Sequence, residues 1–192
     1  MKVEEKALAL DFLPRGRSSD YKTEPLAQLI GCEFFTLLEV VTRAGVSLKA
    51  HEEVYVGKDD RPVVDYIKRR ILYKDLTNNS LNELEGAVEK IVAESEQRFV
   101  EFFNISRSIT IKRHQLELLP GMGKKHMLQV LAEREKKIFS SFKDLRERVP
   151  GIPDPVKAVV GRIVEELERE DIRHYIFVRP PSKEREFRPR RF

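Results

Sequence analysis

A short run in the middle of the chain combines two glycines with two lysines: Pro120, Gly121, Met122, Gly123, Lys124 and Lys125. Glycine lets the backbone take positive φ and approach a ligand closely. A helix that starts after such a turn points free backbone N–H groups outward, and these groups attract anions. Because lysines follow directly, we expect the anion to be a nucleic-acid phosphate, contacted without reading any base. In this interpretation the amides of residues 121–123 contact the phosphate and the two lysines assist.

The surrounding segment, residues 116–131, resembles the helix-hairpin-helix motif, in which a Gly-apolar-Gly turn joins two short helices. The five apolar positions of the motif are filled by Leu116, Leu119, Met122, Val130 and Leu131. Met127 stands where the motif usually has a small residue, so the packing departs from the pattern while the phosphate turn does not. A purely structural or protein-binding hairpin is the alternative interpretation.

A second, degenerate copy of the turn occupies residues 149–155 and contains Gly151. Here Pro153 replaces the second glycine and removes a backbone donor. Asp154 followed by Pro155 predicts an N-cap and the first position of a helix. Because Asp154 would repel phosphate, we expect the first hairpin to carry more of the binding.

One catalytic alternative rests on Lys125. In helix-hairpin-helix DNA glycosylases, the lysine two places after the second glycine can be a Schiff-base nucleophile, with an aspartate nearly twenty residues later. Lys125 matches this position and Asp144 lies nineteen residues beyond it. The Val-Asp-Thr-His type of context around that aspartate is absent, however, and so are the iron-sulfur cysteines, since Cys32 is alone. We therefore expect no enzyme and no catalytic residue.

Cofactor and metal chemistry find no support in the residue spacing. The four histidines show no metal-ligand spacing, and a lone cysteine forms no cluster. We expect no metal and no cofactor.

The N-terminal part predicts β structure. Leu8, Leu10 and Phe12 alternate with smaller or polar residues, which predicts a half-buried strand. Further short apolar segments with turn signals between them follow up to residue 73, and they suggest a small β-barrel, most simply of the OB type. The arginine-containing loop 14–23 and the basic run 68–70 are interpreted as solvated surface.

Helical periodicity then replaces this pattern. Ser80 with Glu83 predicts a capping box, and a long helix follows. Residues 172–179 return to alternation, with the face Arg173, Tyr175, Phe177 and Arg179. This late strand would complete the barrel, and its aromatic rings could stack bases while its arginines meet phosphate. Burial of both rings in a core is an equally weighted alternative.

Composition is that of a soluble globular protein, with 192 residues, 35% charged side chains and a net charge of +4. The last residues form a basic arm, with five cations against two glutamates. No apolar run is long enough to span a membrane. A single cysteine and no recognised targeting segment favour a cytoplasmic location.

Strands, a long helix, the Leu-Leu-Pro-Gly-Met-Gly-Lys hairpin, its degenerate repeat and a final strand together resemble an uncharacterised archaeal family of predicted RNA-binding proteins. The resemblance implies an α+β fold of two domains, an OB-like β-barrel joined to an all-α tandem helix-hairpin-helix domain. The predicted division is barrel 1–78 completed by strand 172–179, connecting helix 79–110, helical domain 111–171 and basic tail 180–192.

We expect a non-enzymatic nucleic-acid-binding protein with RNA favoured over DNA. The alternatives are a lyase or glycosylase that uses Lys125, and an adaptor that contacts ribosomal or transcription proteins.

Overall fold

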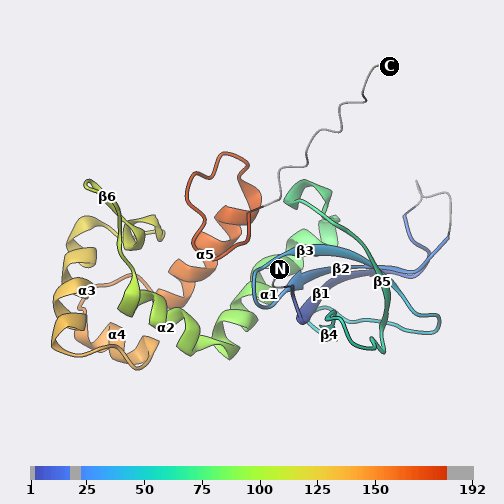
Figure 1. Cartoon of the computed structure of the whole chain (residues 1–192), viewed down its shortest axis with the longest axis horizontal. Helices are drawn as coiled ribbons and strands as arrows, with labels where there is room; N and C mark the ends of the chain where they lie inside the picture. The colour runs from blue at the N-terminus through green and yellow to red at the C-terminus, as the bar shows by residue number, and fades with distance from the viewer. Residues whose placement is uncertain (1–2, 18–22, 181–192) are drawn as a thin grey trace, which may run out of the picture.

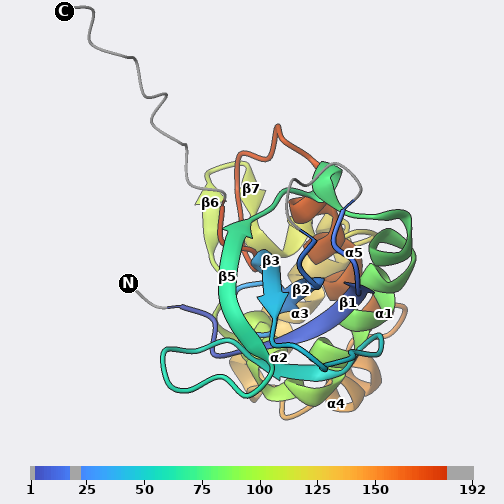
Figure 2. The ribbon, with the colours of Figure 1, turned by 90° about the vertical axis from the view of Figure 1, so that its right-hand side faces the viewer.

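The structure is a computed structural model that describes residues 3–17 and 23–180. Its main strands are β1 (Lys6–Leu13), β2 (Leu26–Gly31), β3 (Leu37–Thr42), β4 (Glu53–Tyr55) and β5 (Val64–Arg70). They form one antiparallel sheet in the order β4-β1-β2-β3-β5. Register shifts interrupt the β1–β2 and β3–β5 pairings, and such bulges bend strands and increase their twist. The sheet accordingly curls into a half-barrel, as Figure 2 shows.

Strand β1 is buried on both faces, and the prediction of a half-buried strand is wrong in this respect. Leu8 packs in a cluster shared with the helices, whereas Ala7 and Ala9 belong to a second cluster within the sheet. The bulge directly after Ala9 adds one residue and reverses the alternation. Phe12 therefore joins the side of the two alanines rather than that of Leu8.

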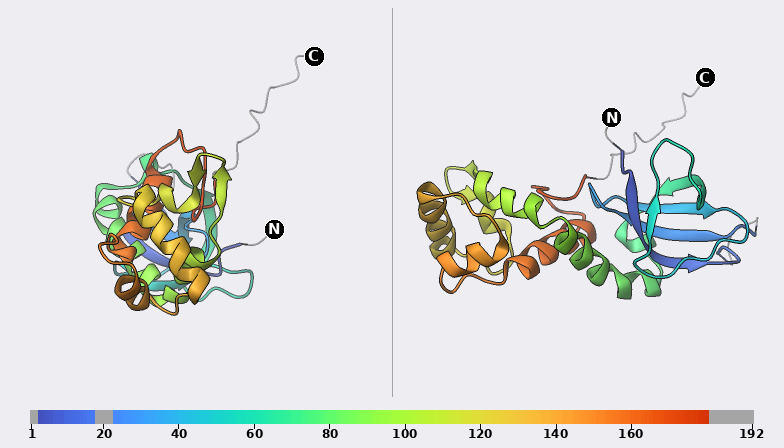
Figure 3. Two further views of the ribbon diagram at one scale, coloured as in Figure 1. Left: turned by 90° about the vertical axis from the view of Figure 1, so that its left-hand side faces the viewer. Right: turned by 90° about the horizontal axis from the view of Figure 1, so that it is seen from below.

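The helices are α1 (Asn78–Glu94), α2 (Glu96–Ile105), α3 (Lys124–Lys136), α4 (Phe142–Arg148) and α5 (Pro155–Glu168). Two 3-10 turns, η1 (Tyr73–Asp75) and η2 (Gln115–Leu118), and a small hairpin of β6 (Ser108–Thr110) and β7 (Arg113–His114) complete the described elements. The molecule is elongated, with the sheet at one end, α3 and α4 at the other, and α1 and α5 between them (Figures 1 and 3). The mixed α+β class predicted from the sequence is confirmed.

The predicted connecting helix 79–110 is two helices and part of a hairpin. Helix α1 is capped by Thr77, whose side chain accepts from the Ser80 amide, so the predicted capping box is wrong. The Ser80 hydroxyl instead donates to the Gln28 side chain at 2.7 Å. Ser95 separates α1 from α2, and residues 108–110 form strand β6 rather than the end of a helix.

One continuous apolar cluster joins the sheet to the helices. It includes Leu8 of β1, Val88 of α1, Phe103 of α2, Val130 of α3 and Ile163 of α5. Helix α1 links the sheet to the helical part of the molecule, because it packs on both β1 and α5. The sheet and the helices thus share a core, and their division into separate domains stays a prediction.

Residues 172–179, called the return segment below, do come back to the sheet end of the molecule but do not form a strand. The buried Glu166 carboxylate accepts the amides of Ile176, Phe177 and Val178 at 2.8–3.0 Å. These donors are therefore taken by a side chain and cannot form a strand ladder. The segment reaches the sheet region through the Arg179 amide, which donates to the Phe34 carbonyl at 3.0 Å.

The predicted basic tail lies outside the described residues from position 181 onward. Among the helices that the structure describes, none is long and apolar enough to cross a membrane.

Candidate nucleic-acid interface

The first hairpin turn depends on Gly121, which has a φ of +75°. The turn closes when the Met122 amide donates to the Leu119 carbonyl at 3.0 Å. The Met122 side chain points into the core and is buried. Positive φ at the glycine is the conformation that the Gly-apolar-Gly pattern predicted.

The free amides of this hairpin lie three residues later in the chain than predicted. Met122 and Gly123 use their amides inside the turn, the second donating to the Gly121 carbonyl at 3.2 Å. Gly123 is the N-cap of α3 and offers no side-chain cap. The first amides of a helix have no intrahelical partner. The donors available to an anion at the helix start are therefore those of residues 124–126, whereas the amides of Met122 and Gly123 are not available.

Two of the exposed residues around these donors are positively charged lysines. Pro120, Gly123, Lys124 and Lys125 are all exposed. Neither lysine forms an ion pair with any residue that the structure describes. An uncapped helix start flanked by two unpaired cations is an arrangement that attracts phosphate.

The second hairpin has the same turn but a blocked helix start. Gly151 takes a φ of +76°. Asp154 caps α5, and its side chain accepts from the Lys157 amide at 3.1 Å. Pro155 at the first helical position has no amide hydrogen. The predicted asymmetry between the two hairpins therefore has a structural basis.

The two turns pack close together. A Cβ atom added at Gly121 would lie 3.1 Å from Cγ of Pro153, and one added at Gly151 would lie 4.0 Å from Nε2 of His126. Gly161 of α5 approaches Pro120 in the same way, with 3.3 Å from its built Cβ to the proline ring. The structure thus brings residues 120–125 and Gly151 to one end of the helical region.

The return segment places its four predicted contact residues in different surroundings. Phe177 is buried, and its ring centroid lies 5.0 Å from that of Phe102. The prediction that Phe177 stacks bases is therefore wrong, because the ring is part of the core. The Arg179 guanidinium lies over the Phe34 ring, 3.9 Å from its centroid. Arg173 is exposed and Tyr175 half-buried, and both line a cavity.

Arg107, Gln115 and His174 line the same cavity and were not singled out from the sequence. The hairpin β6–β7 forms one wall, in a region predicted to be helical. The alternation of Ser108 and Thr110 with β-branched isoleucines was the available signal for strand structure.

The residues of the catalytic alternative are engaged or exposed. Asp144 accepts from the Ser140 amide at 3.0 Å and lies 3.4 Å from Arg148, and these contacts, the amide first, lower the pKa of its carboxyl. Lys125 is exposed at the start of α3. Burial raises the pKa of Cys32 to about 12, which keeps it a thiol rather than a nucleophilic thiolate. Within the described ranges, no group of three or more potential ligands could hold a metal ion.

Comparisons with known proteins place the chain in a family. The family described as "Protein of unknown function (DUF655)" matches residues 3–179. The uncharacterized protein MJ0038 of Methanocaldococcus jannaschii is 40% identical over 180 residues, which cover 93% of this chain and 81% of that protein. The crystal structure of Af1531 from Archaeoglobus fulgidus, assigned to the same family, is similar with a TM-score of 0.85 and 44% identity, over 92% of this chain and 100% of that one. Since the family match spans nearly the whole chain, this protein belongs to the uncharacterised DUF655 family, which has archaeal members.

Proposed function

We propose that this protein binds nucleic acid without catalysing a reaction, and that it contacts the phosphate backbone at the start of α3. The observation that carries the proposal is the uncapped N-terminus after Gly123, with Lys124 and Lys125 exposed beside its free amides. Backbone amides and lysines contact phosphate oxygens and carry no base information. Binding should therefore show little sequence preference.

In this proposal the helices form a tandem helix-hairpin-helix unit and the curled sheet an OB-like barrel. Two glycine turns with φ of +75° and +76°, packed against each other, support the first assignment. Five antiparallel strands in a curled sheet support the second. RNA is placed ahead of DNA because the sequence resembles a family of predicted RNA-binding proteins.

The test is Lys124→Glu combined with Lys125→Glu, with binding to RNA and DNA duplexes measured over a range of salt concentrations. The affinity falls as salt rises, and each lost phosphate contact reduces the magnitude of the slope of log affinity against log salt by about one. The double variant should therefore bind weakly and show a slope smaller by about two.

The matched control is Lys49→Glu with Lys58→Glu. It changes the net charge by the same amount but acts in exposed loops beside the sheet. Its affinity should stay near that of the unmodified protein. Equal affinity losses in the two double variants would show that overall charge, and not the hairpin, determines binding.

A further inference from the structure

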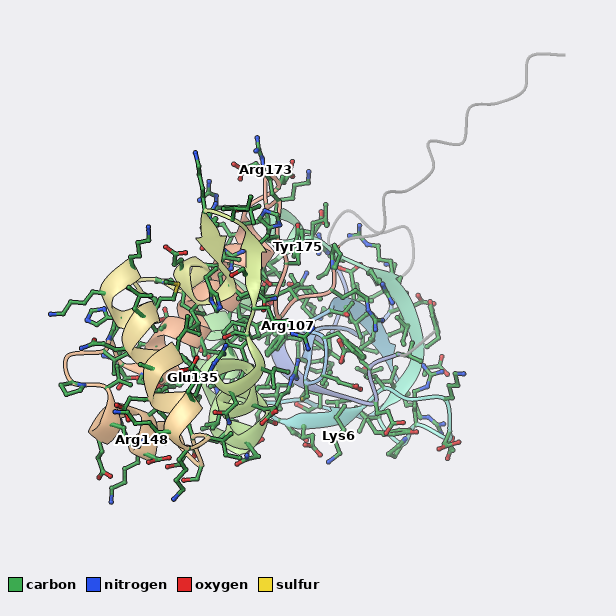
Figure 4. All side chains as sticks on the ribbon, turned by 60° about the vertical axis from the view of Figure 1, so that its left-hand side comes forward. Lys6, Arg107, Glu135, Arg148, Arg173 and Tyr175 are labelled. Atoms are coloured by element: carbon green, nitrogen blue, oxygen red, sulfur yellow. The ribbon has the colours of Figure 1, made fainter. Side chains whose placement is uncertain are left out.

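The structure assigns a second contact to the cavity between the β6–β7 hairpin and the return segment: we infer that it takes one unpaired nucleotide of the bound strand. We call this cavity the cup. Its polar lining comes from Arg107, Ser108, Gln115, Arg173, His174 and Tyr175, and it is an open cavity of about 670 Å³. The inference rests on the proposed function and specifies the form of nucleic acid that is bound. Figure 4 shows Arg107, Arg173 and Tyr175 where the hairpin meets the return segment.

The charge of the cup distinguishes it from the other large cavities. Its lining residues, all within the described part of the chain, include two arginines and no carboxylate. The cavity beside Cys32 and the one beside η1 are each lined by several carboxylates. Arg107 and Arg173 are exposed, and neither forms an ion pair with a described residue. Arg173 does interact electrostatically with nearby Asp171, which lies outside the lining. Two guanidinium groups that line one cavity without an ion pair favour an anionic ligand, and guanidinium pairs well with phosphate.

The walls of the cup are fixed by hydrogen bonds that do not involve its charged groups. On one side, the Arg107 amide donates to the Gln115 side chain at 2.7 Å, and the Gln115 amide donates to the Arg107 carbonyl at 3.0 Å. On the other side, the buried Arg162 donates to the His174 carbonyl at 2.6 Å. A fixed backbone on both sides reduces the ordering that binding would otherwise require.

Tyr175 supplies an aromatic group beside the two arginines. It is partly buried against the core, and its hydroxyl has no hydrogen-bond partner among the described residues. An aromatic ring with a free hydroxyl can stack on a base and bond to its polar edge. The volume of the cup suits a ligand of nucleotide size. Phosphate at the arginines and a base at Tyr175 therefore account for both chemical features of the site.

The position of the cup along the chain connects it with the first hairpin. Gln115 lines the cup, and Lys124, the first residue of α3, is nine residues later. Nine residues span at most about 32 Å, which corresponds to about nine nucleotide steps at about 3.4 Å each. One strand can therefore reach both the start of α3 and the cup. The combined site fits a duplex that ends in a short single-stranded extension.

The experiment compares a blunt RNA duplex with the same duplex carrying a five-nucleotide uridine overhang, and repeats the pair in DNA with thymidines. The unmodified protein should prefer the overhang by about tenfold, the effect of one stacked base. Arg107→Glu with Arg173→Glu should bring this ratio close to one. Tyr175→Leu, which keeps an apolar side chain against the core, should also lower the ratio.

Two further measurements separate the possible results. Lys49→Glu with Lys58→Glu controls for charge and should keep the tenfold ratio. Lys124→Glu with Lys125→Glu should weaken the binding of both duplexes while the ratio persists. An unchanged affinity of this variant for the blunt duplex would refute the hairpin contact but not the cup.

A ratio near one in the unmodified protein, or an undiminished ratio in the variant with both arginines replaced, would overturn the cup assignment. The assignment would also fail if free uridine monophosphate bound more tightly than the duplex with the overhang, since the cup would then be a site for a free nucleotide.

Discussion

Gly123 has no conformational need to be glycine. Its φ is −82°, which any residue can adopt, and a Cβ added there would meet nothing within 4 Å. Gly121 differs, because its φ is +75° and an added Cβ would lie 3.1 Å from Pro153. The space beside Gly123 is therefore available to a ligand rather than filled by the protein.

This contrast predicts opposite effects of two substitutions. Gly123→Ser should raise the free energy of unfolding by a few tenths of a kcal/mol, because serine caps a helix slightly better than glycine. It should also weaken nucleic-acid binding several-fold, since its hydroxyl would accept one of the amides that we propose contact phosphate. Gly121→Ala should lower stability by about 1–2 kcal/mol through strain at positive φ. Denaturation and binding measured on both variants test this, and unchanged affinity in the serine variant would contradict it.

The hydrogen bond between His114 and the Leu116 amide depends on pH. Nδ1 of His114 accepts from the Leu116 amide at 3.1 Å, which only an unprotonated Nδ1 can do. Burial, with the charge of Arg134 as a second cause, lowers the pKa of His114 below its ordinary value of 6.5. The unfolded chain therefore binds the proton first as pH falls. This contribution to stability is complete above about pH 6.5 and is lost as the pH falls toward the folded-state pKa.

We expect His114→Asn, which can accept the same amide, to lose less stability than the unmodified protein between pH 7 and pH 5. The difference should be at most about 1.4 kcal/mol per pH unit. Urea denaturation at several pH values measures it. Parallel stability curves for the two proteins would rule out the histidine as the titrating group.

At the scale of elements, the two hairpins differ in how their second helices begin. Helix α3 starts without a side-chain cap, whereas α5 starts with the carboxylate of Asp154. That carboxylate also lies 3.2 Å from Arg146. The same fold thus presents one attractive and one repulsive helix start at the same end of the molecule.

Asp154→Asn should keep the cap, because asparagine is as good an N-cap as aspartate. It removes a negative charge near the proposed phosphate site and should raise nucleic-acid affinity about threefold at low salt, as expected for a surface charge effect of about 0.7 kcal/mol. The control is Asp65→Asn on the exposed part of β5, which removes the same charge from the sheet end. An equal gain in both variants would mean that the second hairpin is not near the bound strand.

At the scale of the whole molecule, Glu166 connects α5 to the return segment and, through it, to the sheet. Its carboxylate pairs with buried Arg162 at 2.8 Å and accepts three consecutive amides of the return segment. Removing one partner of a buried ion pair leaves an uncompensated charge. The return segment also forms a wall of the cup, so Glu166 supports both the fold and the proposed nucleotide site.

Glu166→Gln should lower the free energy of unfolding by about 3 kcal/mol and speed hydrogen exchange at residues 176–178. It should also reduce the overhang preference while blunt-duplex binding remains. Glu165→Gln, which alters a partly exposed partner of the same arginine, should cost less than about 1 kcal/mol. Similar losses in the two variants would show that burial of the ion pair has no special role.

The features that the sequence predicted well depend on residues close together in the chain. The first glycine turn and the capped start of α5 are set by neighbouring residues, because φ preferences and cap hydrogen bonds act over about four positions. The predicted amide donors lay three residues too early, since the pattern does not show which amides the turn itself uses.

Other features were decided only by contacts between distant residues. Alternation in the return segment indicated a strand, but Glu166 in α5 takes the amides that a strand would need. Phe177 looked available for stacking, yet the rings of α2 enclose it. The cup exists only because the β6–β7 hairpin and the return segment, separated by more than fifty residues, meet in the folded chain. Local residue order thus determined the first glycine turn, whereas the tertiary structure decided which polar groups remain exposed, because hydrogen-bond partners and burial come from every part of the chain.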